Sequence, residues 1–301
     1  MKGPPLSEIT LDQVRATAKP RDAWWTVLLV DPVAIRLVRW WAPYQWITPN
    51  RVTMGAFTLG LGAAAAFWQG TRWWLVVGAL LYHVSFIFDC VDGKLARVRG
   101  TGSVFGLWLD FIFDRLLVVI CAIALMGGQY AQTHQVIYLV LGGVVVVLNL
   151  FRQVNGQTMQ SVRRTMQQQL DAAQGETEGS PAQPDSFSQL SSGARARLGI
   201  FLRVRELLAR HRIRADLISG IEFQMGVFIV GPLIGQVLWT TIVVSALLLA
   251  FELAMIFQFW LATRTFNRRM ARARELPPAV ALPVQVTPSV AADASSPTVT
   301  A

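Results

Sequence analysis

The sequence predicts an all-α, polytopic membrane protein. Of its 301 residues, 53% are hydrophobic and only 15% are charged, whereas a soluble domain carries about 25% charged residues. The apolar residues gather in runs close to the length of about 20 residues that a bilayer-spanning helix needs. Six such runs predict six transmembrane helices, at residues 52–69, 72–92, 104–127, 135–152, 220–238 and 240–261.

The distribution of Lys and Arg predicts the orientation of these helices. Basic residues are dense before the first run, between the second and third, after the fourth and after the sixth, while the other loops hold only Arg72. Because cytoplasmic loops are enriched in Lys and Arg, both termini are expected in the cytoplasm. The plasma membrane is the expected location of the protein. The net charge of +9 then reflects contact with anionic lipid, and no nucleic-acid partner is expected.

Three regions are expected along the chain. Residues 1–47 form a cytoplasmic segment, in which 31–41 is an amphipathic helix lying in the membrane interface. Residues 48–262 form the six-helix membrane domain, which carries a cytoplasmic insertion at 153–219. Residues 263–301 become rich in Pro, Ala, Ser and Thr, and this composition predicts a disordered cytoplasmic tail.

The insertion is itself expected to have three parts. Its first part, 157–173, bears Gln and Arg and is predicted to be helical. A polar linker at 175–193 is predicted to be disordered, because it has too few apolar side chains to form a core. Residues 194–214 read as a basic amphipathic helix, which would attach to anionic lipid.

Four aspartates interrupt the second and third apolar runs. An ionised carboxylate at membrane depth is costly, so it needs a partner and usually has a function. Asp89 and Asp92 are three residues apart, and Asp110 and Asp114 are four apart, so each pair shares one face of a helix. A short loop near residues 100–102 lets the two helices run antiparallel, with the pairs facing each other. Carboxylates without His or Cys favour a hard ion such as Mg²⁺ or Mn²⁺.

Small and basic residues accompany the aspartates. Gly93, Ala96 and Gly106 permit a close approach of helices or the binding of a bulky ligand. Arg97 lies one turn beyond Gly93, where its guanidinium group can bind a diphosphate. Arg115 directly follows the last aspartate and is expected to point away from the acidic face. A buried ion-pair network is the structural alternative, although four carboxylates exceed the needs of simple pairs.

The full pattern from Asp89 to Asp114 is D-x2-D-G-x2-A-R-x8-G-x3-D-x3-D. It resembles the signature of the CDP-alcohol phosphatidyltransferase family at every fixed position and every gap. The stretch from Thr48 to Thr53 is also similar to the family's motif at the start of the first membrane helix. The likeness extends over about residues 45–262. It implies a metal-dependent phosphotransferase of phospholipid biosynthesis, which moves a phosphatidyl or related group from a CDP-linked donor to an alcohol and releases CMP.

The resemblance also implies roles for individual residues. Asp89, Asp92, Asp110 and Asp114 would hold the metal, as two ions of Mg²⁺ or Mn²⁺. Asp114 would in addition be the catalytic base that activates the acceptor hydroxyl. The CDP moiety would be bound by Asn50, Gly93, Arg97 and Gly106.

The expected donor is CDP-diacylglycerol, and the expected acceptor is an alcohol such as inositol phosphate or glycerol phosphate. A phosphate on the acceptor would need a basic side chain, and Arg152, Arg212 and Arg214 are the candidates. Glu222 is expected to pair with one of these arginines or to lie near a helix N-terminus. His83 is expected to pack between helices. Membrane lipids and a second copy of the chain, as a homodimer, are the other expected partners.

Other functions stay open at this point. A relative of the same family could use a CDP-linked polar alcohol as donor and a lipid as acceptor. A cation-coupled transporter would also hold intramembrane aspartates, but near the bilayer midplane and often with repeated halves. A polyprenyl transferase would carry two separated acidic motifs, whereas this chain has one compact block.

Overall fold

The computed structural model describes residues 10–174 and 220–275, and within these ranges it is all-helical, without a strand. Three of the described helices are long and apolar enough to cross a membrane: Arg72–Arg99, Ile137–Ala172 and Val237–Arg268. The all-α prediction is confirmed, and these helices identify an integral membrane protein. The predicted linker 175–193, the predicted helix 194–214 and the part of the predicted tail from residue 276 on lie outside the described residues. The tail was expected to be disordered from residue 263 on, which was wrong for 263–275, because these residues continue the helix Val237–Glu275.

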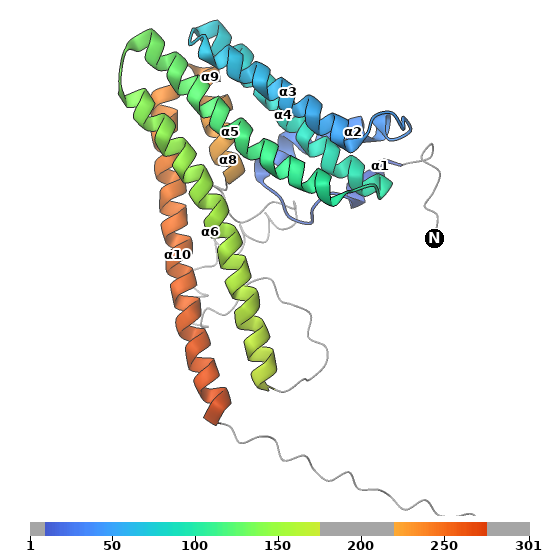
Figure 1. Cartoon of the computed structure of the whole chain (residues 1–301), viewed down its shortest axis with the longest axis vertical. Coiled ribbons are helices and arrows are strands. Elements are labelled where there is room, and N and C mark those ends of the chain that lie inside the picture. Colours follow the sequence, from blue (N-terminus) through green and yellow to red (C-terminus); the bar gives the residue numbers. More distant parts are fainter. Residues whose placement is uncertain (1–9, 175–219, 276–301) are drawn as a thin grey trace, which may run out of the picture.

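Within residues 10–174 and within residues 220–275, the helices follow one another with short connections (Figure 1). In chain order they are α1 (Leu11–Ala16), the π-helix η2 (Thr26–Val30), α2 (Asp31–Trp41), α3 (Pro49–Trp68), α4 (Arg72–Arg99), α5 (Val104–Thr133), α6 (Ile137–Gln174), α8 (Gly220–Met225), the π-helix η4 (Gly226–Val230), α9 (Gly231–Ile234) and α10 (Val237–Glu275). Figure 1 shows α6 and α10 running side by side well beyond the other helices.

Local sequence signals explain where the helices around the aspartates begin and end. The Thr48 side chain accepts a hydrogen bond from the Arg51 N–H and caps α3, whose first residue is proline. The Ser103 side chain caps α5 in the same way, by accepting from the Gly106 N–H. Between them α4 ends at Gly100, which adopts a left-handed φ of 65° that glycine tolerates without strain.

Two of the predicted apolar runs differ from the helices that form. The run 135–152 and the polar stretch 157–173 are one continuous helix, α6, because no proline or helix-ending turn separates them. The run 220–238 is shorter and irregular: α8, η4 and α9 cover it only as far as Ile234, and Gly235 ends it with a left-handed φ of 74°. The Arg72 guanidinium group donates to the carbonyls of Pro232 and Leu233 and so caps α9 from the start of α4.

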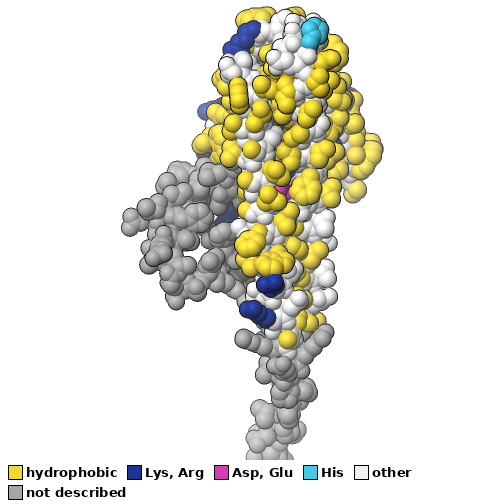
Figure 2. All heavy atoms as spheres, turned by 90° about the vertical axis from the view of Figure 1, so that its left-hand side faces the viewer, with side chains coloured by type: hydrophobic (Ala, Val, Ile, Leu, Met, Phe, Trp, Pro, Cys, Tyr) yellow, Lys and Arg dark blue, Asp and Glu magenta, His cyan; other side chains and the backbone are white. Residues whose placement is uncertain are grey.

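The core lies where α3 packs against both α4 and α5. Phe228 of η4 joins it, with its ring centroid 4.8 Å from that of Tyr82 and 6.3 Å from that of Phe67. Close backbone contact needs glycine at Gly128, where a Cβ atom would lie 2.3 Å from the Phe67 carbonyl oxygen. The outer surface is apolar as well, and Figure 2 shows hydrophobic side chains over most of the described face. This surface suits contact with lipid.

Candidate active site

The structure brings three of the four aspartates together. Asp89 and Asp92 come from α4 and Asp110 from α5, and one carboxylate oxygen of each lies within 4.8 Å of the other two. Both helices pack on α3, so their carboxylates meet beside a common support. The spacing of the aspartates predicted this convergence.

The three carboxylates fit a divalent cation. Asp110 Oδ1 is buried and has no hydrogen-bond partner among the described residues. Asp92 is 5% exposed, and the Thr53 hydroxyl of α3 donates a hydrogen bond to its Oδ2. Buried carboxylates repel one another unless a cation or a proton lies between them. An all-oxygen set of this kind is the one that Mg²⁺ and Mn²⁺ prefer.

Asp114 lies beside this cluster, in the wall of a cavity of about 470 Å³ that Asp89 and Asp110 also line. Arg115 lines the same cavity, with its Nη1 atom 3.9 Å from Asp114 Oδ2 and its guanidinium carbon 4.8 Å from the Phe111 ring centroid. The expectation that Arg115 points away from the acidic face was therefore wrong. Its long side chain folds over Phe111, one turn earlier, and brings the charge back to the cavity.

The residues expected to bind CDP form two close pairs. A Cβ atom at Gly106 would lie 2.9 Å from Asn50 Oδ1, so a larger residue there would displace the Asn50 side chain at the start of α3. A Cβ atom at Gly93 would lie 3.6 Å from Arg97 Nη1, so that guanidinium group covers the glycine. None of these four residues lines the 470 Å³ cavity.

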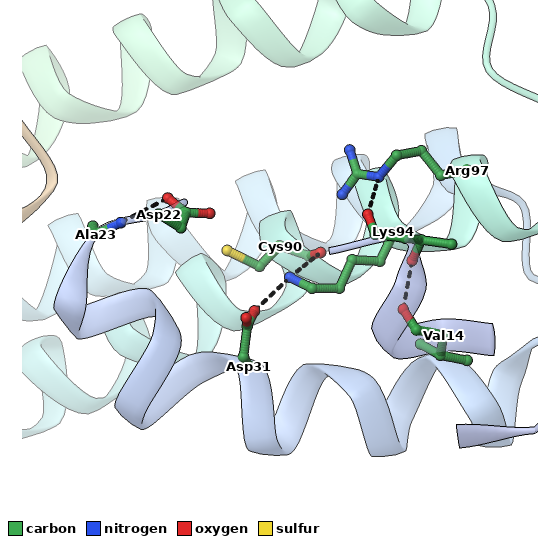
Figure 3. Close-up of polar contacts among 8 residues, drawn as sticks. Val14, Asp22, Ala23, Asp31, Cys90, Lys94 and Arg97 are labelled. Atoms are coloured by element: carbon green, nitrogen blue, oxygen red, sulfur yellow. Dashed lines mark hydrogen bonds and ion pairs between the residues drawn. The ribbon is translucent and has the colours of Figure 1, made fainter. Parts of the chain in front are cut away.

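A segment that leads into α2 lines the cavity, although the sequence analysis assigned it only to a cytoplasmic N-terminal segment. We call residues 17–31 the N-terminal strap. Two contacts attach it to α4. Arg97 Nε donates to the Thr17 carbonyl over 2.9 Å, and Lys94 Nζ lies 2.8 Å from Asp31 Oδ1; Figure 3 labels Lys94, Asp31 and Arg97. The Trp24 N–H donates to Glu222 Oε1 of α8 over 3.2 Å. Strap residues line the cavity as well, namely Lys19, Asp22 and Thr26.

Arg152 is the one acceptor-binding candidate within the described ranges, since Arg212 and Arg214 lie outside them. It lines the cavity from α6, and its Nη1 donates to Glu252 Oε1 of α10 over 2.9 Å. Glu252 was missed, although a lone carboxylate inside the last apolar run was a signal. His83 packs edge-on against the Trp25 ring at 6.0 Å, in agreement with its expected packing role.

Comparisons with known proteins give a consistent result. Residues 46–174 match the family model of CDP-alcohol phosphatidyltransferase. Archaetidylinositol phosphate synthase of Methanothermobacter thermautotrophicus is 28% identical over 127 residues, which are 42% of this chain and 55% of that protein. Phosphatidylinositol phosphate synthase of Mycolicibacterium smegmatis is 36% identical over 91 residues, which are 30% of this chain and 37% of that protein.

A third relative is named for a different acceptor alcohol, glycerol 3-phosphate. CDP-diacylglycerol–glycerol-3-phosphate 3-phosphatidyltransferase of Cereibacter sphaeroides is 34% identical over 111 residues, which are 36% of this chain and 47% of that protein. The chain thus spans about half, or less, of the length of these three curated relatives. The matched region contains all four aspartates and Arg152 but ends before α8 and α10.

Proposed function

We propose, from the premise that residues 46–174 belong to the CDP-alcohol phosphatidyltransferase family, that this membrane protein transfers a phosphatidyl or other substituted phosphate group from a CDP-linked donor to an alcohol. The observation that carries the proposal is the convergence of three carboxylates beside a cavity that Asp114 also lines. The names of the relatives describe transferases of this kind.

Asp89, Asp92, Asp110 and Asp114 are the residues that would hold Mg²⁺ or Mn²⁺, as two ions. When bound, such ions neutralise phosphate charge and stabilise the attacking and leaving oxygens of an in-line displacement. Asp114, in the cavity wall, accepts the proton of the acceptor hydroxyl. The acceptor oxygen forms a bond to the β-phosphorus of the donor, the bond from that phosphorus to the bridging oxygen breaks, and CMP leaves with the bonding electrons.

The nucleotide would lie next to this centre. Asn50 and Gly106 form one contact at the start of α5, and Gly93 and Arg97 form a second on α4. Two N–H-bearing groups of Arg97 remain for a diphosphate, because its bond to the strap uses only Nε. The bond to the strap thus holds the Arg97 side chain in the position from which it would bind the diphosphate of the donor.

CDP-diacylglycerol is the proposed donor, and a phosphorylated polyol such as inositol phosphate or glycerol phosphate is the proposed acceptor. Two of the relatives described above are named for inositol phosphate products, and one is named for CDP-diacylglycerol and glycerol 3-phosphate. Arg152 in the cavity wall supports an anionic acceptor. A CDP-linked polar alcohol with a lipid acceptor is the alternative within the same chemistry.

The proposed topology has six membrane crossings, formed by α3, α4, α5, α6, the α8–α9 segment and α10. Residues 48–262 are the catalytic membrane domain, 1–47 a cytoplasmic segment with α2 in the interface, and 263–301 a cytoplasmic tail. The active site and both termini would face the cytoplasm across the plasma membrane, and a homodimer is the proposed assembly. Support comes from the basic loops and from the hydrophobic outer surface.

An acceptor screen tests the proposed function. Purified protein in lipid nanodiscs receives CDP-diacylglycerol, Mg²⁺ and one acceptor at a time, namely inositol 1-phosphate, glycerol 3-phosphate, inositol or glycerol, and released CMP and the lipid product are measured. CMP release that requires an acceptor, with the matching phospholipid as product, is the expected result. Release only from a CDP-linked polar alcohol would transfer the assignment to the alternative, and no release from either donor would contradict the function.

A further inference from the structure

Glu252 is a fully buried carboxylate in the apolar part of α10. Its side chain is 0% exposed, and both oxygens are bonded to α6: Arg152 Nη1 donates to Oε1 over 2.9 Å and Asn155 Nδ2 donates to Oε2 over 2.6 Å. The chain matches the family only over residues 46–174. Glu252 therefore lies outside the matched region, while both of its partners lie inside it.

Stability alone does not explain this arrangement. Burying a carboxylate and a guanidinium group removes both from water, and replacing a buried pair by apolar side chains is often neutral or stabilising. Charged groups inside membrane segments more often mark a functional site. The neighbours of the pair indicate which function this is.

Arg152 is held in one place at the edge of the cavity. Its guanidinium carbon lies 5.1 Å from the centroid of the Phe251 ring, beside the bond to Glu252. The side chain is 19% exposed and lines the cavity. A guanidinium group has five N–H donors, and the bond to Glu252 uses one nitrogen, so donors remain for an anion in the cavity.

Amide side chains surround Arg152 on the same wall. Gln153, Gln157 and Gln160 of α6 and Gln224 of α8 line the cavity. Gln224 is fixed by its Nε2, which donates to Asn149 Oδ1 over 2.9 Å. An amide both donates and accepts hydrogen bonds, as a hydroxyl group does. The cavity-lining residues of α6 and α8 thus include one cation, Arg152, and several amides that can bond to hydroxyl groups, a combination that suits a phosphorylated polyol. Lys19 and Arg115 are the other cations that line the cavity.

We propose that Glu252, together with Asn155, is a positioning residue that holds Arg152 in the cavity wall, where Arg152 binds the phosphate of a polyol-phosphate acceptor and the glutamines bind its hydroxyl groups. This inference rests on the proposed function for the name of the acceptor. The buried carboxylate keeps the guanidinium group at the cavity edge, so that less side-chain freedom is lost when the acceptor binds.

The test compares Glu252→Gln with wild type in nanodiscs. The substitution keeps the shape of the side chain and removes its charge. We expect the acceptor KM for inositol 1-phosphate or glycerol 3-phosphate to rise at least tenfold, while kcat and the donor KM change less than threefold. The double variant Arg152→Met/Glu252→Met should stay folded, because no lone buried charge remains, and should lose the preference for phosphorylated acceptors over inositol or glycerol. Leu253→Ala, on the exposed face of α10, is the matched control and should leave all constants unchanged.

Isothermal titration calorimetry measures binding of the same polyol phosphates in the absence of donor. Because this measurement needs no CMP release, it tests the acceptor subsite separately from the proposed function. Binding by wild type that weakens at least tenfold in Glu252→Gln supports the subsite, even if no CMP is released and the proposed function fails. No binding by wild type, or equal binding by wild type and both variants, overturns it. An equal loss of kcat with every acceptor, with acceptor KM unchanged, also overturns it, because that result indicates a merely structural role.

Discussion

Thr53 is the residue through which α3 reaches the candidate metal site. Its hydroxyl donates to Asp92 Oδ2 inside the protein, where both side chains are buried. A carboxylate that holds a metal depends on such outer hydrogen bonds for its orientation, and their loss typically costs about 10–100-fold in metal affinity or activity. Thr53 was not predicted, because its contact with α4 arises from helix packing and not from spacing along the chain.

Replacing Thr53 tests this support. Thr53→Val keeps the side-chain volume but leaves Asp92 without the donated bond. We expect the Mg²⁺ concentration for half-maximal CMP release to rise about tenfold, whereas Thr53→Ser should stay near wild type because it keeps the hydroxyl. A Mg²⁺ titration of CMP release measures both. Equal Mg²⁺ dependence of the valine variant and wild type would contradict the role.

Sequence spacing predicted the acidic residues well but not their surroundings. Four carboxylates on two adjacent helices have few ways to avoid one another, so their convergence followed from the helix repeat. Arg115 was misplaced, because its orientation depends on the rotamer that folds it over Phe111. Other residues that line the cavity with Asp89, such as Thr26 and Gln224, come from distant parts of the chain that periodicity does not relate.

At the scale of helices, one buried ion pair joins α2 to α4. Lys94 and Asp31 have side chains that are only 5% and 7% exposed, and their charged atoms are 2.8 Å apart. Lys94 belongs to the same turn as Asp92 and Gly93, so this pair sets where the strap meets the helix that bears Asp89 and Asp92. Removing one partner of a buried pair typically costs about 3–5 kcal/mol.

Variants of this pair should show that coupling. Lys94→Met leaves the Asp31 charge buried without Lys94, and we expect a clear drop in the thermal unfolding midpoint of the purified protein. The double variant Asp31→Leu/Lys94→Met should recover most of that loss. Arg15→Met is the control, because the Arg15–Asp12 pair is exposed and contributes little. If the double variant is no more stable than Lys94→Met, the pair does not couple the two helices.

At the scale of helices, the sequence predicts where several helices begin better than where they end. Hydropathy located the first residues of α3, α4 and α5 closely, and the N-caps Thr48 and Ser103 stand beside the apolar runs of α3 and α5. It ended α4 at residue 92 and α5 at residue 127, before their last residues Arg99 and Thr133. It ended α6 too early, since polarity does not stop a helix that lacks a capping signal. The π-helical turn η4 follows from packing against α4 and α10, which the sequence pattern does not contain.

At the scale of the whole molecule, the proposed orientation in the membrane rests on the distribution of Lys and Arg along the chain. The α4–α5 turn at residues 100–103 would face the cytoplasm, and the α5–α6 turn near Gln135 would face the opposite side. In a background lacking Cys90 and Cys121, Gln135→Cys should react with a membrane-impermeant maleimide on intact cells. Gly102→Cys, at an open position, should react only after lysis. The reverse pattern would contradict the orientation.

The central claim is that the aspartate cluster performs metal-dependent transfer. Its most direct test is CMP release from CDP-diacylglycerol and the acceptor found by the screen, measured while Mg²⁺ is removed with EDTA and then restored. We expect release to stop without the metal, to return with Mg²⁺ or Mn²⁺, and to be absent at every metal concentration in Asp114→Asn, with that variant still folded in the membrane. Release that continues in EDTA, or at the wild-type rate in Asp114→Asn, would contradict the claim.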